Sequence, residues 1–186
     1  MWRRIALGIA IASAFGAGLS LAATSRESAP STLGPSYGFS LELPKGWIGR
    51  IYDANRGTQP PIADLQAGSF LTADDLDLLK DSDLGSGVAQ NMQPGDILIL
   101  VWETLGSGGF DYEPLLSAPQ IGPDNLMTAL EGMPTGHAVG RVFFSTEGRA
   151  FDLMVEFGTL SPEPAQLDRA NQVLRTLRVG PRTSDN

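Results

Sequence analysis

The sequence predicts an α+β fold: a mostly antiparallel, twisted sheet of about five or six strands flanked by helices, with a C-terminal helix packed on the sheet. Short stretches of alternating apolar and polar residues recur between glycine- and proline-rich turns, which is typical of paired strands. Residues 97–102 are apolar without interruption, which indicates a strand covered on both faces. Apolar residues recur at spacings of three and four from Leu167 to Leu177, which predicts a helix with one buried side.

Residues 1–22 are typical of a secretory signal. Arg3 and Arg4 precede an uncharged, mostly apolar run over residues 5–23, and residues 20–22 (SLA) fit the small-x-small pattern of a cleavage site. We expect cleavage after Ala22. The alternative is an uncleaved anchor, because the run is about long enough to span a bilayer. The sequence therefore predicts an extracytoplasmic protein, secreted or tethered, that meets the membrane only through this segment if it is not cleaved.

The rest of the chain divides into a spacer, one domain and a tail. Residues 23–36 are rich in Ser, Thr and Pro with little to bury, which predicts a flexible spacer. A single α+β domain is expected over residues 37–180, and residues 181–186 are expected to be a loose tail.

The composition argues against a nucleic-acid partner and excludes disulfides and cysteine-linked lipid. The chain carries 21 acidic and 13 basic residues, a formal net charge of −8, and no cysteine. Binding to nucleic acid depends on Lys and Arg neutralising phosphates, so no nucleic-acid partner is expected. Without cysteine, neither a disulfide nor a lipid attached through a lipobox is available, and burial must supply the stability.

The first half of the domain opens with a predicted hairpin. Residues 39–43 alternate apolar and polar side chains, a turn follows at Pro44 to Gly46, and residues 47–52 form the returning strand. A third strand is expected within residues 62–71. Two short helices are expected after it, over residues 72–80 with Thr72 as N-cap and over residues 88–92, before a turn at residues 94–96.

The second half contains the central strand and a second hairpin. We take residues 97–102 as the central strand. Residues 106–136 show little periodicity, and part of them is expected to be a helix over 124–130 capped by Asp124. The next strands are expected over residues 138–144 and 149–157, joined by a turn at Gly148. The final helix is expected to have Ser161 as its N-cap and a buried stripe made of Leu167, Ala170, Val173, Leu174 and Leu177.

About a third of the chain resembles a known family. The stretch Tyr37–Trp47 (YGFSLELPKGW) resembles the opening hairpin of PsbP-like and LpqN-type domains, in which an aromatic-rich strand runs into a Pro-x-Gly-Trp turn. The strand over 151–157 and the helix carrying Asn171 to Leu174 are similar to the end of those domains. The resemblance implies an α/β/α sandwich and an accessory or partner-binding role. The chain lacks the lipobox cysteine of the lipoprotein members and obvious counterparts of the photosystem-binding basic residues.

We expect no catalytic, metal or cofactor site. The acidic residues Asp74, Asp75, Asp77, Asp81 and Asp83 are of a type that binds Ca²⁺, but their spacing does not continue as an EF-hand loop, so a solvated surface is expected.

His137 is the only histidine, and no Gly-x-Ser-x-Gly motif accompanies it, so we expect it at a turn or on the surface. Four carboxylates on or beside strands could pair as in a glycosidase, but are expected to be solvated. They are Glu42, Glu103, Asp152 and Glu156.

The candidate contact residues are Ile48, Arg50 and Tyr52, which occupy alternate positions of the second strand of the predicted hairpin. The favoured function is an exported, non-enzymatic accessory or binding domain of the cell envelope. Its partner would be a protein or another envelope component, bound through one face of the sheet or through residues 106–136. The alternative is a hydrolase of envelope material that acts through strand carboxylates.

Overall fold

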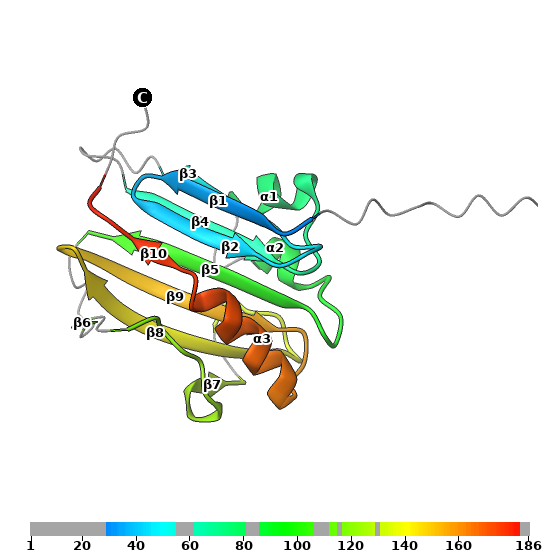
Figure 1. The fold of residues 1–186 in the computed structure, drawn as a ribbon. Helices are drawn as coiled ribbons and strands as arrows, with labels where there is room; N and C mark the ends of the chain where they lie inside the picture. Colours follow the sequence, from blue (N-terminus) through cyan, green and yellow to red (C-terminus); the bar gives the residue numbers. More distant parts are fainter. Residues whose placement is uncertain are drawn as a thin grey trace, which may run out of the picture.

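The computed structural model describes residues 29–54, 62–80, 86–105, 112–114, 117–128 and 131–182. Its strands form a seven-stranded sheet in the order β3-β4-β5-β9-β8-β6, with β7 also paired to β8, and a three-stranded sheet in the order β1-β2-β10 (Figure 1). Every strand pair is antiparallel except β6 with β8. The α+β class is therefore confirmed, and the larger sheet has more strands than we expected.

The large sheet is built around the apolar run that the sequence predicts as central. Its strands are β3 (Ile48–Asp53), β4 (Ala63–Gly68), β5 (Ile97–Thr104), β6 (Glu113–Pro114), β7 (Leu126–Met127), β8 (Ala138–Thr146) and β9 (Arg149–Phe157). Strand β5 lies between β4 and β9. Its side chains enter two core clusters, Ile99 on one face and Leu98 on the other, which explains why the run does not alternate.

The small sheet corrects two expectations about the start of the domain. It consists of β1 (Ser31–Ser36), β2 (Phe39–Leu43) and β10 (Arg178–Val179). The part of the predicted spacer from Ser31 to Ser36 is thus a strand. The predicted hairpin is also wrong, although the turn forms, with the Trp47 N–H donating to the Pro44 carbonyl at 3.1 Å. Both edges of β2 are occupied by β1 and β10, so β3 pairs with β4 in the other sheet.

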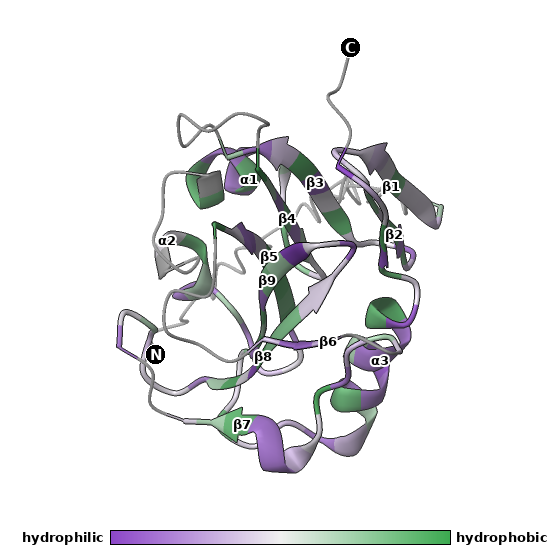
Figure 2. Ribbon diagram, turned by 90° about the vertical axis from the view of Figure 1, so that its left-hand side faces the viewer, coloured by the Kyte–Doolittle hydropathy of each residue, from purple (hydrophilic) through white to green (hydrophobic). Residues whose placement is uncertain are grey.

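The elements form three layers, which Figure 2 shows edge-on. The seven-stranded sheet is the middle layer. Helices α1 (Ala73–Lys80) and α2 (Ser86–Ala89) lie on one side, and the small sheet lies with α3 (Pro164–Leu174) on the other. The resemblance implied helices on both sides; here the second side is shared between a helix and a sheet.

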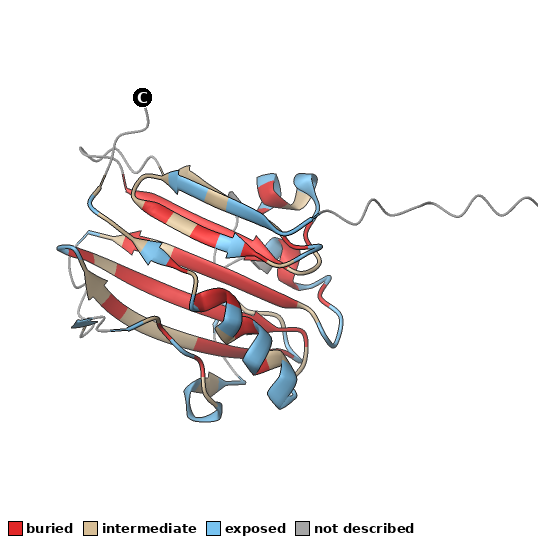
Figure 3. Cartoon of the chain, viewed as in Figure 1, coloured by how far each residue is buried: buried red, intermediate tan, exposed pale blue. Residues whose placement is uncertain are grey.

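Two apolar cores fill the spaces between the layers, and burial is concentrated on β4, β5 and β9 (Figure 3). The first core lies under β2 and α3, and it contains one face of β9, Phe151, Leu153, Val155 and Phe157, and the predicted helix stripe. The second core lies under α1 and α2 and includes Leu79, Val88 and Met92 against Leu98 and Met154.

Helix boundaries follow local capping groups. As predicted, Thr72 caps α1: its hydroxyl accepts from the Asp75 N–H, and the Asp75 carboxylate accepts from the Thr72 N–H at 2.8 Å. Helix α3 starts at Pro164, later than the predicted start after Ser161, because Gln166 closes the turn by accepting from the Glu163 N–H at 2.9 Å.

The helix predicted after Asp124 is wrong over the described residues of that segment. Pro123–Asn125 form a single 3-10 turn, and Leu126–Met127 then pair with β8. The Asn125 side chain accepts from the Gly122 N–H at 3.0 Å, and the Asn125 N–H donates to the Gly122 carbonyl, which closes the turn locally.

Some expectations concern parts of the chain outside the described residues. These are the signal over residues 1–22, the start of the spacer, residues 23–28, and the end of the tail, residues 183–186. Arg182, in the tail predicted to be loose, contacts Glu103. Within the described ranges, no helix is both long and apolar enough to cross a membrane.

Candidate functional site

The predicted contact residues lie on β3, on the same side of the large sheet as α1 and α2. All three are half-buried rather than fully exposed. Ile48 packs against the second core. The guanidinium of Arg50 lies over the Tyr52 ring, 4.9 Å from its centroid, and donates to Asp77 of α1 at 2.9 Å. Arg50 and Tyr52 are therefore held as a stacked pair next to the helix.

Strand register extends this pair into a row across the sheet. Tyr52 is opposite Asp64, which is opposite Trp102. Trp102 is in turn opposite Asp152, which is opposite Phe143. Because neighbouring strands lie about 4.8 Å apart, the three aromatic residues recur roughly every 10 Å. We call Tyr52, Trp102 and Phe143 the aromatic row.

The far end of the aromatic row repeats the arrangement at Tyr52. The Arg141 guanidinium lies 4.7 Å from the centroid of the Phe143 ring. Arg141 also binds the Asp152 carboxylate through two nitrogens, with Nε to Oδ1 at 2.9 Å. The hydrogen bond to Asp152 raises the pKa of Arg141 above its ordinary value. Tyr112 packs edge-on against Phe143, 5.8 Å between centroids. An arginine–aromatic stack thus lies on each side of Trp102.

Glu103 lies on the opposite face of the sheet and is fully buried. Arg149 donates to both of its oxygens, at 3.0 and 2.8 Å, Arg182 donates to Oε1, and the Ala63 N–H donates to Oε2 at 3.0 Å. Burial alone would raise the pKa of Glu103, but these donors outweigh burial and hold it below its ordinary value.

Arg149 extends this cluster into the small sheet. Its Nη1 donates to the carbonyls of Tyr37 and Gly180, each at 3.0 Å. Its guanidinium also contacts two aromatic rings, at 4.9 Å from the centroid of Phe39 and 5.0 Å from that of Phe151. Every described contact of Glu103 and Arg149 thus joins parts of the fold, which indicates a structural role.

A pair that we did not predict joins His137 to Glu156. Their Nδ1 and Oε1 atoms are 2.5 Å apart, Glu156 has no exposed surface, and His137 is 9% exposed. The second carboxylate oxygen, Oε2, is buried and has no hydrogen-bond partner in the structure. Burial raises the pKa of Glu156, although the bond to His137 opposes the shift. The expectation that Glu156 is solvated is therefore wrong, and it is wrong for Glu103 and Asp152 as well. His137, expected at a turn or on the surface, follows a turn but is buried.

The register of the second hairpin could have revealed this pair. A two-residue turn at Glu147 and Gly148 places Val139 opposite Glu156. His137 is two residues from Val139, so it extends from the same face of the hairpin. The missing information was that α1 and α2 would cover this face.

His137 lines a cavity of about 690 Å³ at the end of β8. The wall combines apolar residues with hydroxyl groups and one carboxylate. The lining residues are Thr128, Glu131, Met133, Pro134, Thr135, Gly136, His137, Val139, Leu160 and Ser161.

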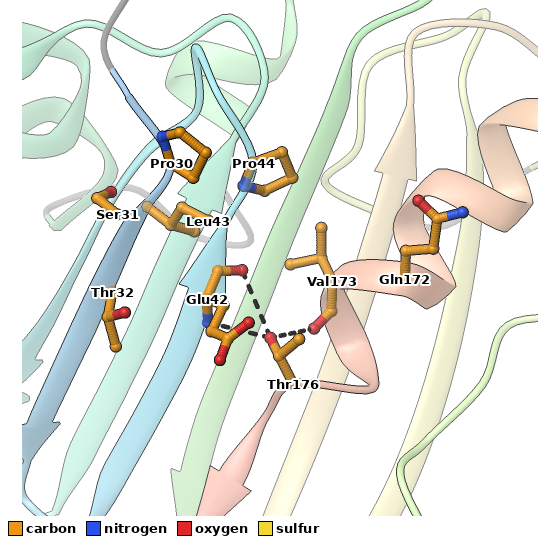
Figure 4. Close-up of a pocket in the computed structure, with 9 residues that line it drawn as sticks. All are labelled: Pro30, Ser31, Thr32, Glu42, Leu43, Pro44, Gln172, Val173 and Thr176. Atoms are coloured by element: carbon orange, nitrogen blue, oxygen red, sulfur yellow. Dashed lines mark hydrogen bonds between the residues drawn. The ribbon is translucent and has the colours of Figure 1, made fainter.

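A smaller cavity of about 290 Å³ lies between β2 and α3 (Figure 4). The Thr176 hydroxyl at its base accepts from the Glu42 N–H at 3.0 Å and lies 2.7 Å from the Val173 carbonyl, to which it donates. That hydroxyl already joins the helix to the strand, so we interpret this cavity as a gap in the packing of α3 on β2 and not as a binding site.

The four strand carboxylates do not form a catalytic pair. Glu103 is opposite Phe151 of β9, and Glu156 lies five residues further along that strand. Because side chains alternate along a strand, Glu103 and Glu156 extend from opposite faces of the sheet. Asp152 is bound by Arg141, and Glu42 belongs to the small sheet.

The acidic segment is likewise occupied where the structure describes it. Asp75 caps α1 and Asp77 binds Arg50, whereas Asp81 and Asp83 lie outside the described residues. No group of three or more His, Asp or Glu residues within the described ranges is placed to hold a metal ion.

No protein-family model, no curated protein and no solved structure matches this chain. The resemblance to PsbP-like and LpqN-type domains stays a hypothesis.

Proposed function

We propose that the chain is an exported, non-enzymatic accessory domain that binds a protein partner through the aromatic row and its two stacked arginines. The observation that carries this proposal is the repeat of an arginine–aromatic stack on each side of Trp102. Tyr, Trp and Arg are enriched among the few residues that contribute most of the binding energy in protein interfaces. Tyr and Trp bury large areas with few rotatable bonds, and Arg stacks on aromatic rings.

The charges of this surface favour a protein over a polyanion. Asp77 and Asp152 already neutralise Arg50 and Arg141, and the chain as a whole has a formal net charge of −8. A phosphate backbone or an anionic lipid surface would be repelled, since neither finds uncompensated cations here. A protein surface can instead pack on the rings and share the hydrogen bonds of the paired side chains.

The cellular location is part of the proposal. Basic residues at the N-terminus, an apolar run and a small-x-small site support export, and the resemblance to accessory domains supports a binding role. Mass spectrometry of the exported protein is expected to find an N-terminus at Ala23. A peptide that still contains residues 1–22 would support the anchor instead.

The test compares two double variants that each remove one positive charge. Arg50→Ala with Tyr52→Ala removes one stack. Gln172→Ala with Arg175→Ala changes an exposed residue of α3 and the exposed residue that caps its C-terminus, on the other side of the large sheet (Figure 2). A partner is first isolated by crosslinking in envelope fractions, and its affinity for each purified protein is then measured.

We expect the first double variant to bind at least about tenfold more weakly, a loss of about 1.4 kcal/mol, and the second to bind like the wild type. Equal affinity of the two double variants would contradict a contact at the aromatic row. Thermal unfolding of each variant shows whether a loss of binding merely reflects a loss of structure.

The hydrolase alternative keeps one supporting observation, the hydrogen bond between His137 and the buried Glu156. A carboxylate that orients a histidine is a known arrangement for a general base. Turnover of envelope material that disappears in Glu156→Gln would support it. A substrate panel without turnover would remove it.

A further inference from the structure

The cavity beside His137 is independent of the aromatic row, and its lining indicates a ligand. We propose that it binds a small organic cation, a primary amine with an apolar body, with His137 and Glu131 as the residues that contact the ammonium group. This site goes beyond the proposed protein-binding function and does not depend on it.

The apolar part of the wall fits the body of such a ligand. Met133, Pro134, Val139 and Leu160 line the cavity, and the Leu160 side chain is 49% exposed. Val139 and Met133 also pack with the second core, so this part of the wall is continuous with a fixed structure. A volume of about 690 Å³ is in the range of small-molecule sites.

The polar part of the wall selects the sign of the ligand charge. Glu131 is the only Asp, Glu, Lys or Arg among the described lining residues. An anion would approach this carboxylate without any compensating cation, whereas a cation is attracted to it. The overall charge of −8 acts in the same direction.

The neutral His137 ring presents an acceptor at Nε2 when Glu156 is ionised. Its Nδ1 is bound to Glu156, and no hydrogen bond from Nε2 to another described residue is present. Nε2 is also not among the buried unpartnered atoms, so it reaches the solvent of the cavity. With the proton on Nδ1, the lone pair of Nε2 accepts from an ammonium N–H.

Glu156 supplies a second reason to expect a cation. Its carboxylate is fully buried, it has only His137 as a partner, and Oε2 accepts no hydrogen bond. A positive charge in the adjacent cavity would offset part of the cost of burying this carboxylate. The same charge would favour the ionised form that orients the His137 ring.

The test uses three ligands of similar size that differ in charge: 2-phenylethylamine, 2-phenylethanol and phenylacetate. His137 is the only histidine, so a single imidazole C–H signal in a ¹H–¹³C NMR spectrum reports on the site. At pH 7.5 we expect the amine to shift this signal saturably. The alcohol should bind at least about tenfold more weakly, and phenylacetate should not bind measurably.

Variants show which residues contact the amine. Glu131→Gln, an exposed change that leaves the fold intact, is expected to weaken amine binding about five- to tenfold, and Glu156→Gln to weaken it as well. Glu147→Gln, in the distant hairpin turn, is the matched control and should bind like the wild type. Phenylacetate binding as tightly as the amine, a shift that does not saturate, or equal affinities of Glu131→Gln and Glu147→Gln would each overturn the proposal.

Discussion

At the scale of single residues, three buried acids of the large sheet have different partners. Glu103 binds two arginines, Asp152 binds Arg141, and Glu156 binds only His137. The alternation of β9 places Asp152 and Glu156 on the same side of the sheet. It does not predict burial, because the layers that cover the sheet come from segments distant in the chain.

Glu103→Gln should be among the most destabilising changes in this protein. The substitution leaves Arg149, which is almost fully buried, without a counter-charge, and Arg182 loses its partner as well. Breaking a buried ion pair from one side typically costs about 3–5 kcal/mol. We expect a loss of that size in urea unfolding at pH 7. The control Asp77→Asn breaks a pair whose acid is 85% exposed, and should cost less than about 1 kcal/mol.

The effect of Glu103→Gln should also depend on pH. Because the folded pKa of Glu103 lies below its unfolded value, the ionised side chain stabilises the fold above the ordinary carboxyl pKa of about 4.3. This contribution is lost as pH falls through the folded pKa. The difference in stability between wild type and variant should therefore narrow below about pH 4. A constant difference from pH 3 to pH 7 would show that the carboxylate charge is not the cause.

At the scale of elements, periodicity predicts the long, regular segments and misses the short ones. Strands β2, β5 and β9 are close to their predicted positions, because alternation or continuous apolarity extends over most of their length. Strands β7 and β10 have two residues each, too few for any period. Their existence depends on pairing with β8 and β2, and the partner of β10 lies more than 130 residues away along the chain.

The turn of the β8–β9 hairpin requires a glycine for its backbone conformation alone. Gly148 has φ of +69°, and a Cβ added there would meet no atom within 4 Å. Gly148→Ala should lower the free energy of unfolding by about 1–2 kcal/mol, the cost of a left-handed conformation. Gly148→Asn should cost less, since asparagine adopts this conformation more readily. Chemical unfolding of both variants is the measurement, and equal losses would contradict the backbone explanation.

Asn171 is expected to fix the segment before β7 to α3. Its side chain accepts from the Ile121 N–H at 2.8 Å and donates to the Ile121 carbonyl at 2.9 Å. Ile121 is 1% exposed, so Asn171→Ala would leave its backbone groups unpaired, at a cost of about 1–3 kcal/mol. The neighbouring exposed change Gln172→Ala is the control and should be nearly neutral in thermal unfolding. Faster hydrogen exchange of the Ile121 amide only in Asn171→Ala would confirm the cause.

At the scale of the whole molecule, the two ends of the domain meet in the small sheet. Strand β2 lies between β1, from the N-terminal side, and β10, from the C-terminal side. Arg149 of the large sheet donates hydrogen bonds to the carbonyls of Tyr37 and Gly180, which adjoin β1 and β10 of the small sheet. The sequence indicates an α+β class but does not predict that β1 and β10 pair with the same strand, because no local pattern specifies which strands become neighbours.

The sequence likewise predicts only the local part of the candidate site. Arg50 and Tyr52 are correctly predicted as neighbours on one strand face, since alternation is local. Their alignment with Trp102 and Phe143 depends on the strand order β3-β4-β5-β9-β8, which periodicity does not contain. Ile48 lies on the same face but packs against the core under α1 and α2, so it does not extend the contact surface.

The position of β1 predicts where the domain can be shortened. Its residues pair with Leu43, Glu42, Leu41 and Phe39 of β2, and Leu33 packs against the first core. A chain that starts at residue 29 keeps these contacts, whereas one that starts at residue 37, the boundary expected from the sequence, loses them.

We expect the chain that starts at residue 37 to unfold at least about 5–10 °C lower, because a loss of 1 kcal/mol shifts the midpoint of a protein of this size by about 2–4 °C. The exposed edge of β2 should also promote association, since unpaired strand edges recruit other chains. Calorimetry and size-exclusion chromatography of the two proteins measure both effects. Equal midpoints with equal elution volumes would show that β1 does not belong to the cooperative unit.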